Sequence, residues 1–174
     1  MHRSNTCTFP ICHPTYASPI LPQDGDARRY SLAAKRAAMG PYIVQHWGWD
    51  EALQLRLHRE RFAEKPFFKI VWQGRDVGTV SLMRLADCIR FGEFHLFPEH
   101  HSRGIGSKVL LHCITLADAE AMPVRLEYLK WNPVGTLYRR HGFAVIGQTD
   151  VHWLMERPAT AGRLSDDDGG ACGL

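Results

Sequence analysis

Apolar residues recur along the chain with two different periods, and each period predicts a different kind of element. In residues 104–121 the apolar positions Ile105, Val109, Cys113 and Leu116 are three or four residues apart, which predicts an amphipathic helix. In residues 123–130 apolar and charged residues alternate, which predicts a strand. The same criteria predict further strands at 16–21, 67–72, 77–83, 88–97, 143–146 and 151–155, and further helices at 24–39, 51–62 and 132–141.

Two local signals set helix boundaries in the first third of the chain. Gly40-Pro41 is expected to end the helix of residues 24–39, because proline lacks the N–H that a helix interior needs. Pro41 then fits the start of another helical turn or two, up to Trp47. Asp50 precedes the helix of residues 51–62 and is a good N-cap residue, since its carboxylate can accept from the first free N–H groups.

The order of these elements indicates an α/β (mixed α+β) fold in which helices cover a mixed sheet, and not a doubly wound parallel sheet. A chain of 174 residues, 45% of them hydrophobic, suits one globular domain. We expect this domain to span residues 14–158. Residues 1–13 are expected to form an irregular N-terminal extension, and residues 159–174, which are polar and glycine-rich, a disordered tail.

Charge and cysteine content limit the classes of partner and the compartment. The net charge is +3, and the lysine and arginine residues are scattered, so no nucleic-acid partner is expected. No apolar run approaches the roughly 20 residues of a membrane span, and no membrane partner is expected. The five cysteines form no CxxC pair, and Cys88 and Cys113 lie in apolar patterns, which is typical of a reducing, cytoplasmic location.

The segment from Pro98 to Ser107 follows a predicted strand and opens a predicted helix. A glycine-containing loop at a helix N-terminus presents N–H groups and the positive end of the helix dipole to an anion such as phosphate. It is not a Walker loop, because Ser107-Lys108 has the wrong order, and Gly104-Ile105-Gly106 lacks the third glycine of the dinucleotide fingerprint. By itself the motif is equally compatible with a purely structural turn.

A second motif, Asn132-Pro133-x4-Tyr138-x3-Gly142-Phe143, begins 28 residues after Gly104. Together with His101-Ser102-Arg103-Gly104-Ile105-Gly106, it resembles the GNAT superfamily of N-acetyltransferases, whose phosphate loop reads Gln/Arg-x-x-Gly-x-Gly/Ala. The resemblance covers Tyr16 to Glu156, and the segment from Pro41 to Asp50 resembles a bacterial-type subgroup of the superfamily. It implies a mostly antiparallel sheet of six to seven strands, splayed between strands four and five, with helices on both faces.

The resemblance also implies acetyl-CoA as the co-substrate and no metal. The pyrophosphate would rest on the amides of the loop, and the pantetheine arm would fill the gap between the two splayed strands. The residues that this assigns to the cofactor are Phe94, Leu96, Phe97, His101, Ser102, Arg103, Gly104, Ile105, Gly106, Ser107, Asn132 and Tyr138. His101 departs from the usual Gln or Arg, so we expect weaker or pH-dependent nucleotide affinity. Asn132 also suits a structural role as an N-cap before Pro133.

For catalysis, the resemblance implies that the Leu96 amide stabilises the tetrahedral oxyanion and that Tyr138 protonates the leaving thiolate. Tyr138 is equally suited to packing against Phe143. For the general base, Glu93 is the first candidate, His95 the second and a chain of water molecules the third. Glu93 and His95 share one face of a regular strand with Phe94 on the other, and a β-bulge would turn either toward the ligand.

The acceptor is expected to contact Trp47, Trp49 and Gln54, where the two tryptophans would form an aromatic cage for a cationic amine. The alternative is that both tryptophans anchor the core.

From the resemblance we expect direct transfer of an acetyl group to a primary amine, either of a small molecule or of a peptide N-terminus or lysine. The second hypothesis is a CoA-binding sensor domain with weak or lost catalysis. The expected assembly is a monomer or a homodimer.

Overall fold

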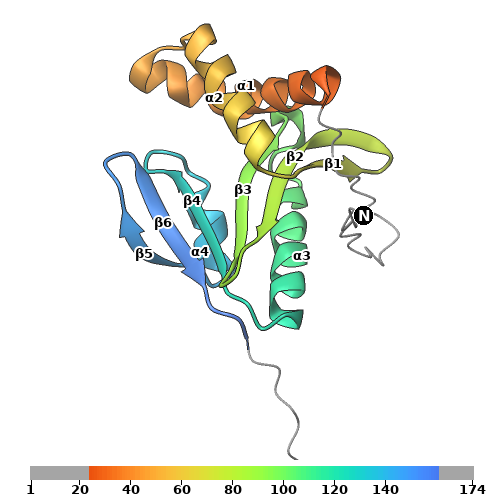
Figure 1. Ribbon diagram of the computed structural model, residues 1–174, viewed down its shortest axis with the longest axis vertical. Helices are drawn as coiled ribbons and strands as arrows, with labels where there is room; N and C mark the ends of the chain where they lie inside the picture. The colour runs from red at the N-terminus through yellow and green to blue at the C-terminus, as the bar shows by residue number, and fades with distance from the viewer. Residues whose placement is uncertain (1–23, 161–174) are drawn as a thin grey trace, which may run out of the picture.

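The computed structural model describes residues 24–160, which form a curved sheet with helices packed on it (Figure 1). The expected strand at 16–21, the extension at 1–13 and the tail beyond residue 160 lie outside the described residues. The elements are α1 (Gly25–Trp47), α2 (Glu51–Glu64), β1 (Phe67–Trp72), β2 (Arg75–Arg84), β3 (Ile89–Leu96), a 3₁₀ turn (Pro98–His100), α3 (Ile105–Ala119), β4 (Val124–Leu129), α4 (Gly135–Arg140), β5 (Ala144–Gln148) and β6 (His152–Arg157).

The six described strands form one sheet in the order β1-β2-β3-β4-β6-β5. Every neighbouring pair is antiparallel except β3 and β4, which are parallel. The prediction of a mixed, mostly antiparallel sheet is therefore confirmed. The expected fourth and fifth strands are β3 and β4 here, because the expected first strand lies outside the described residues.

The parallel strands β3 and β4 pair only where both begin. Ile89 lies opposite Val124 and Arg90 opposite Arg125, and the Ile89 N–H donates to the carbonyl oxygen of Pro123. Beyond these residues the two strands diverge, and the splay that the GNAT resemblance implies is present in the structure.

Helices cover both faces of the sheet, as the alternation of side chains in β1 shows. Phe67 packs with Ala27 and Phe62 of α1 and α2, whereas the next residue, Phe68, belongs to the main core with residues of α3 such as Val109. Because neighbouring residues of a strand point to opposite faces, α1 and α2 lie on one face and α3 on the other. Figure 1 shows α1 and α2 crossing one end of β2 and β3.

The expected break at Gly40-Pro41 is wrong, since α1 continues from Gly25 to Trp47 with Pro41 inside it. Proline removes one backbone hydrogen bond from the helix interior, which costs about 3 kcal/mol. Burial of Ala34 and Lys35 before the proline and of Ile43 after it holds both halves on the sheet. Tertiary packing therefore overrides the local signal.

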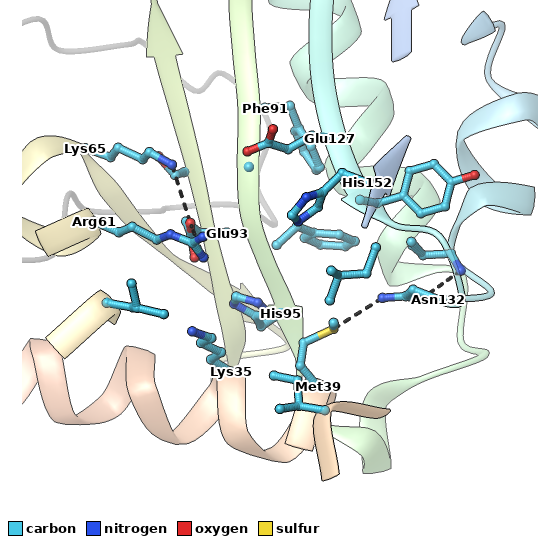
Figure 2. A pocket seen from close by; sticks show the side chains of 18 of the residues that line it. Lys35, Met39, Arg61, Lys65, Phe91, Glu93, His95, Glu127, Asn132 and His152 are labelled. Carbon is cyan, nitrogen blue, oxygen red and sulfur yellow. Dashed lines mark hydrogen bonds and ion pairs between the residues drawn. The ribbon is translucent and has the colours of Figure 1, made fainter. Parts of the chain in front are cut away.

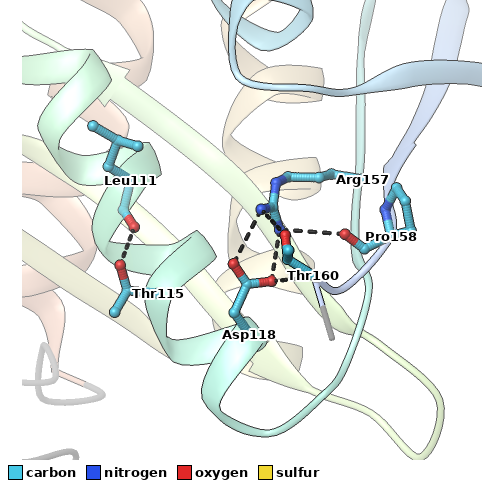
Figure 3. A network of polar contacts seen from close by, with 6 residues as sticks. All are labelled: Leu111, Thr115, Asp118, Arg157, Pro158 and Thr160. Carbon is cyan, nitrogen blue, oxygen red and sulfur yellow. Dashed lines mark hydrogen bonds and ion pairs between the residues drawn. The ribbon is translucent and has the colours of Figure 1, made fainter. Parts of the chain in front are cut away.

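A polar network joins the end of β6 to the last turn of α3 (Figure 3). Arg157 makes two hydrogen bonds to the Asp118 carboxylate, at 2.8 and 3.0 Å, and the Thr160 N–H donates to the same carboxylate. This contact joins Thr160, two residues beyond the expected domain boundary, to α3. The contact also neutralises a carboxylate near the C-terminus of a helix, where negative charge is unfavourable.

Gly78 lets β2 approach β3 more closely than any side chain would allow. A Cβ atom at Gly78 would lie 2.1 Å from the His95 carbonyl oxygen, whereas one at Gly92 of β3 would meet nothing within 4 Å. We expect Gly78→Ala to lower the free energy of unfolding by about 3 kcal/mol or more. Gly92→Ala is the matched control and should raise it by about 0.5 kcal/mol. Urea denaturation measures both, and equal midpoints for the two variants would contradict the close approach.

Candidate active site

A cavity of about 270 Å³ occupies the space that the divergence of β3 from β4 opens. Helix α1 contributes one stripe to its wall, formed by Lys35, Met39, Ile43 and Trp47 at intervals of four residues. Helix α2 contributes a second stripe that includes Gln54 and Arg61, while β3, β4 and Tyr138 of α4 complete the lining. The site therefore depends on two helices that meet over a gap in the sheet.

A β-bulge in β3 brings consecutive side chains to the cavity. Glu93 and Phe94 both lie opposite Val80 of β2, because the register shifts between Thr79 and Ser81. Glu93 has a φ of 46°, a left-handed conformation that residues other than glycine rarely adopt. As a result Glu93, Phe94 and His95 all line the cavity, which a regular strand would not permit. A β-bulge, which the sequence left open as a way to turn Glu93 or His95 toward the ligand, is therefore present here.

Glu93 lies among cationic side chains on one side of the cavity (Figure 2). Its Oε1 atom is 3.4 Å from Lys65 Nζ and 3.6 Å from an Arg61 guanidinium nitrogen. Burial raises the pKa of Glu93, but the adjacent His95 imidazole and the charges of Arg61, Lys65 and Lys35 outweigh it and hold the pKa below its usual value. The carboxylate is therefore ionised and accepts a proton only weakly, which argues against Glu93 as the general base.

His95 is buried at the cavity wall, with 8% of its surface exposed, and its Nδ1 atom has no hydrogen-bond partner among the described residues. Burial is the main cause that lowers the pKa of His95 to about 4, and the charge of Lys35 acts in the same direction. The imidazole is therefore neutral at pH 7 and is also a weak base.

Tyr138 forms a wedge between the diverging strands. Its ring centroid lies 6.3 Å from that of Phe91 on β3 and 5.6 Å from that of Tyr128 on β4, and it also packs 6.0 Å from Phe143. The two expected roles are thus compatible, because the ring packs while the residue lines the cavity. Burial, followed by the neighbouring Tyr128, raises the pKa of Tyr138, so the hydroxyl keeps its proton at neutral pH.

The loop before α3 presents a row of backbone N–H groups. Within residues 24–160, no backbone carbonyl accepts from the N–H groups of residues 102–107, and the first helical bond runs from Lys108 to Gly104. Gly104 has a φ of 75°, which explains the need for glycine there. A Cβ at Gly106 would lie 3.5 Å from the Phe94 ring, so the loop adjoins the cavity. Such a cradle fits a pyrophosphate.

His101 differs from the rest of this loop. Its Nε2 atom donates to the Leu96 carbonyl oxygen at 2.8 Å, and its backbone N–H donates to Pro98. Both groups are used within the chain, so the free amides of the loop begin at Ser102. The imidazole instead connects the loop to the end of β3.

Of Phe94, Leu96 and Phe97, the three residues whose backbone was expected to bind the pantetheine arm, the last two lie at the end of β3 and differ in their hydrogen bonding. The Phe97 N–H donates to the Val77 oxygen, and its carbonyl accepts from the His100 N–H, so Phe97 is already paired. Because neighbouring peptide groups of a strand point in opposite directions, the Leu96 N–H points away from β2, toward the gap. Of the two, Leu96 keeps an N–H group for a ligand.

The expected acceptor residues divide into two groups. Trp47 and Gln54 line the cavity, and Gln54 Oε1 is buried with no partner among the described residues. Trp49 is not part of the lining; it bonds Glu51 and lies beneath the Arg36 guanidinium. Trp47 is 57% exposed and packs against Trp131, so neither the two-tryptophan cage nor a core role for Trp47 is correct.

Asn132 lies at the opposite wall of the cavity from Lys35 (Figure 2). Its Oδ1 atom accepts from the Val134 N–H at 3.0 Å in the turn that leads into α4, while its Nδ2 atom donates to the Met39 sulfur. The N-cap of α4 is Val134, which makes no side-chain cap bond, so the expected N-cap role of Asn132 is wrong: its Oδ1 atom closes an Asx turn before the helix instead. The second contact joins this wall to α1.

Residues 63–145 match the family model described as the acetyltransferase (GNAT) domain. This segment belongs to an acetyltransferase domain of the GNAT superfamily. No curated protein has a sequence that matches the chain significantly.

Solved structures of acetyltransferases share the fold of this GNAT domain. The structure of the PaiA N-acetyltransferase from Thermoplasma acidophilum in complex with coenzyme A has a TM-score of 0.65 at 17% identity, covering 82% of this chain and 98% of that one. The ribosomal-protein-S18-alanine N-acetyltransferase from Escherichia coli has a TM-score of 0.60 at 16% identity, covering 85% and 97%. At these identities the likeness shows the fold.

Three of the cationic residues that line the cavity, Lys35, Arg61 and Lys65, were not expected from the sequence. A signal for Lys35 was available, because Ala27, Ser31, Ala34 and Lys35 follow the i, i+4, i+7, i+8 spacing of a buried helical stripe. Arg61 and Lys65 offered none, since α2 is rich in charged residues on several sides.

Residues 24–160 contain no group of three or more His, Cys, Asp or Glu side chains placed to hold a metal ion. None of their helices combines the length and the apolar character that crossing a membrane requires.

The low pKa of His95 makes the stability of the GNAT domain depend on pH. The unfolded chain protonates this histidine near pH 6.5, but the folded chain does so only near pH 4. Stability should therefore fall as the pH drops from 6.5 to 4.5, and His95 should account for roughly 2 kcal/mol of that loss. We expect His95→Gln to flatten this part of the profile in urea denaturation, with a residual slope from His58, whose pKa burial also lowers. An unchanged slope would contradict the assignment.

Proposed function

We propose that this protein is an acetyl-CoA-dependent N-acetyltransferase that moves the acetyl group directly to a primary amine. The observation that carries the proposal is the combination of the gap between β3 and β4 with the free amides of residues 102–107 beside it. The amides and the dipole of α3 suit the pyrophosphate, and the gap suits the extended pantetheine arm with the Leu96 N–H at its edge. The match to the GNAT family supports acetyl-CoA as the co-substrate.

In the proposed reaction the amine nitrogen attacks the thioester carbonyl carbon, and the carbon–sulfur bond then breaks. The Leu96 N–H donates to the developing oxyanion. The leaving thiolate takes the proton of the Tyr138 hydroxyl, which the raised pKa of Tyr138 keeps in place until then. The Tyr138 phenolate regains a proton from water in the cavity, and the products are the acetylated amine and CoA.

The acceptor amine must also lose a proton, and we propose that this proton leaves through water in the cavity. Glu93 and His95 both line the cavity, but the pKa of each is held below its usual value. Of the three possibilities raised by the sequence, the water chain is therefore favoured.

The two described cysteines, Cys88 and Cys113, favour direct transfer over a covalent acetyl-enzyme, because both are buried. Burial raises the pKa of the Cys113 thiol to about 12, so it is a poor nucleophile.

The same weak bases favour the second candidate function, a CoA-binding sensor domain with weak or lost catalysis. The sensor would use the same loop and gap and would need neither a base nor the Tyr138 hydroxyl. The two functions differ in one measurement, the release of CoA in the presence of amines.

Tyr138→Phe tests the proposed acid. The ring of phenylalanine preserves the wedge between β3 and β4, and no hydrogen bond of the hydroxyl exists within residues 24–160 to be lost. We expect kcat to fall about 100-fold or more, with the Kd for CoA unchanged. Tyr30→Phe, which lies outside the cavity lining, is the matched control and should leave kcat unchanged.

A CoA-release assay with a panel of amines measures these rates. If Tyr138→Phe retains the wild-type kcat, the proposed acid is wrong. If the wild-type protein binds CoA but releases none from acetyl-CoA with any amine, the sensor function is correct.

Arg103 is an exposed cation within the proposed pyrophosphate loop, where it can reach a phosphate of the nucleotide. We expect Arg103→Ala to raise the Kd for CoA about 5-fold, which corresponds to about 1 kcal/mol for a charge-assisted contact in solvent. If the partner is the ribose phosphate, the Kd for dephospho-CoA should not change. Arg75→Ala, on the β1–β2 turn, is the control. Isothermal titration measures both, and equal affinities of the two variants for CoA would exclude this role.

A further inference from the structure

We propose that the acceptor amine carries an anionic group, a carboxylate or a phosphate, which Lys35 holds at the α1–α2 side of the cavity. This inference rests on the proposed acetyltransferase function and names the class of its acceptor. It depends on a buried cation that faces the cavity without a partner.

Lys35 lies in the middle of α1, on the stripe that forms the cavity wall. Only 6% of its surface is exposed, and it makes no hydrogen bond and no ion pair within residues 24–160. Transfer of an ammonium group from water to such a position is costly unless an opposite charge or several hydrogen bonds compensate it. Burial lowers the pKa of Lys35, and so does the charge of Arg61, while Glu93 opposes them. An anion in the cavity would supply the missing partner.

The carboxylate of Glu93, which lies in the same cavity as Lys35, already pairs with two other cations. The same Oε1 atom of Glu93 forms ion pairs with both Lys65 and Arg61. Its single negative charge is thus divided between these two cations and a longer-range attraction to Lys35. Elsewhere in the lining, Arg90 of β3 and Glu127 of β4 pair with each other at 3.3 Å. The cavity lining thus holds four cationic side chains and two carboxylates. A cationic acceptor without an acid group, such as a polyamine, would be repelled at this end.

The remaining polar groups of this part of the cavity suit the other half of such an acceptor. Gln54 Oε1 and His95 Nδ1 are buried, line the cavity and lack partners within the described residues. Unpaired buried groups of this kind favour a ligand that brings its own hydrogen-bonding atoms. A small molecule with an acid group near Lys35 and an amine directed at the thioester uses both features.

The test compares matched acceptors in the CoA-release assay. Three amino acids (alanine, glutamate and phenylalanine) are each compared with their carboxamide and with the amine that lacks the carboxyl group. O-phosphoethanolamine is compared with ethanolamine, and spermidine serves as the polycation. We expect kcat/KM to be at least 10-fold higher for the anionic member of at least one matched set. An amino-acid amide is the weaker base and is more deprotonated at neutral pH, so the intrinsic bias runs against this expectation.

Lys35→Met assigns any such preference to Lys35. We expect the variant to lose the preference at least 10-fold, through a higher KM for the anionic acceptor, with unchanged kcat/KM for the amide and unchanged Kd for CoA. Lys69→Met, which removes a cation paired with Asp76 outside the cavity, should keep the preference. Because the substitution removes an unpaired buried charge, the thermal midpoint of Lys35→Met should rise by a few degrees, so lost activity will not reflect unfolding.

The outcomes separate the two proposals. Equal use of acids, amides and simple amines, or a preference for spermidine, overturns the anionic acceptor and leaves the acetyltransferase function intact. A preference that survives in Lys35→Met also overturns it. If no amine is acetylated although CoA binds, the enzymatic function fails. In that case glutamate and O-phosphoethanolamine are titrated into the CoA-loaded protein. Binding that Lys35→Met abolishes supports an anion site at Lys35, and the absence of binding overturns it.

Discussion

The short parallel contact between β3 and β4 is the constraint on which the rest of the structure depends. Two residue pairs join the strands where they begin, and the remaining residues of each strand diverge. The backbone edge of β3 that is thereby left without a partner strand would be a liability in a protein with nothing to cover it. Here Tyr138 wedges between aromatic residues of the two strands, and α1 and α2 close one side of the gap.

The bulge at Glu93 is the second constraint, and its consequence is electrostatic. By placing one extra residue opposite Val80, it brings Glu93 and His95 to the same cavity that Phe94 lines. The left-handed backbone conformation at Glu93 thus places a carboxylate in the cavity. Strained backbone of this kind is common at the functional sites of proteins. The bulge and the cationic stripe of α1 and α2 together create a cavity whose positive charge exceeds what its own carboxylates neutralise.

Much of the fold follows from local patterns. The period of the apolar positions in α3 and the alternation in β4 predicted both elements within a residue or two, and Asp50 caps α2 by accepting from the Leu53 N–H. The strong turn signal at Gly40-Pro41 misled, because a helix held on the sheet by residues on both sides of a proline tolerates the loss of one hydrogen bond. The expectation for Trp49 was also wrong, because the sequence does not show which way an aromatic side chain near a cavity points. In the structure Trp49 contacts Glu51 and Arg36 instead of the cavity.

The sequence by itself determined the family resemblance, the glycine-containing loop before α3 and the position of Tyr138, because these depend on the spacing of a few residues within continuous segments. The tertiary structure alone decided the charge of the cavity. Lys35, Arg61 and Glu93 are far apart in the chain, and each would be an ordinary surface charge in its own element. They meet only when α1 and α2 pack across the bulged end of β3, and burial there turns a scattered set of charges into a field that acts on one ligand.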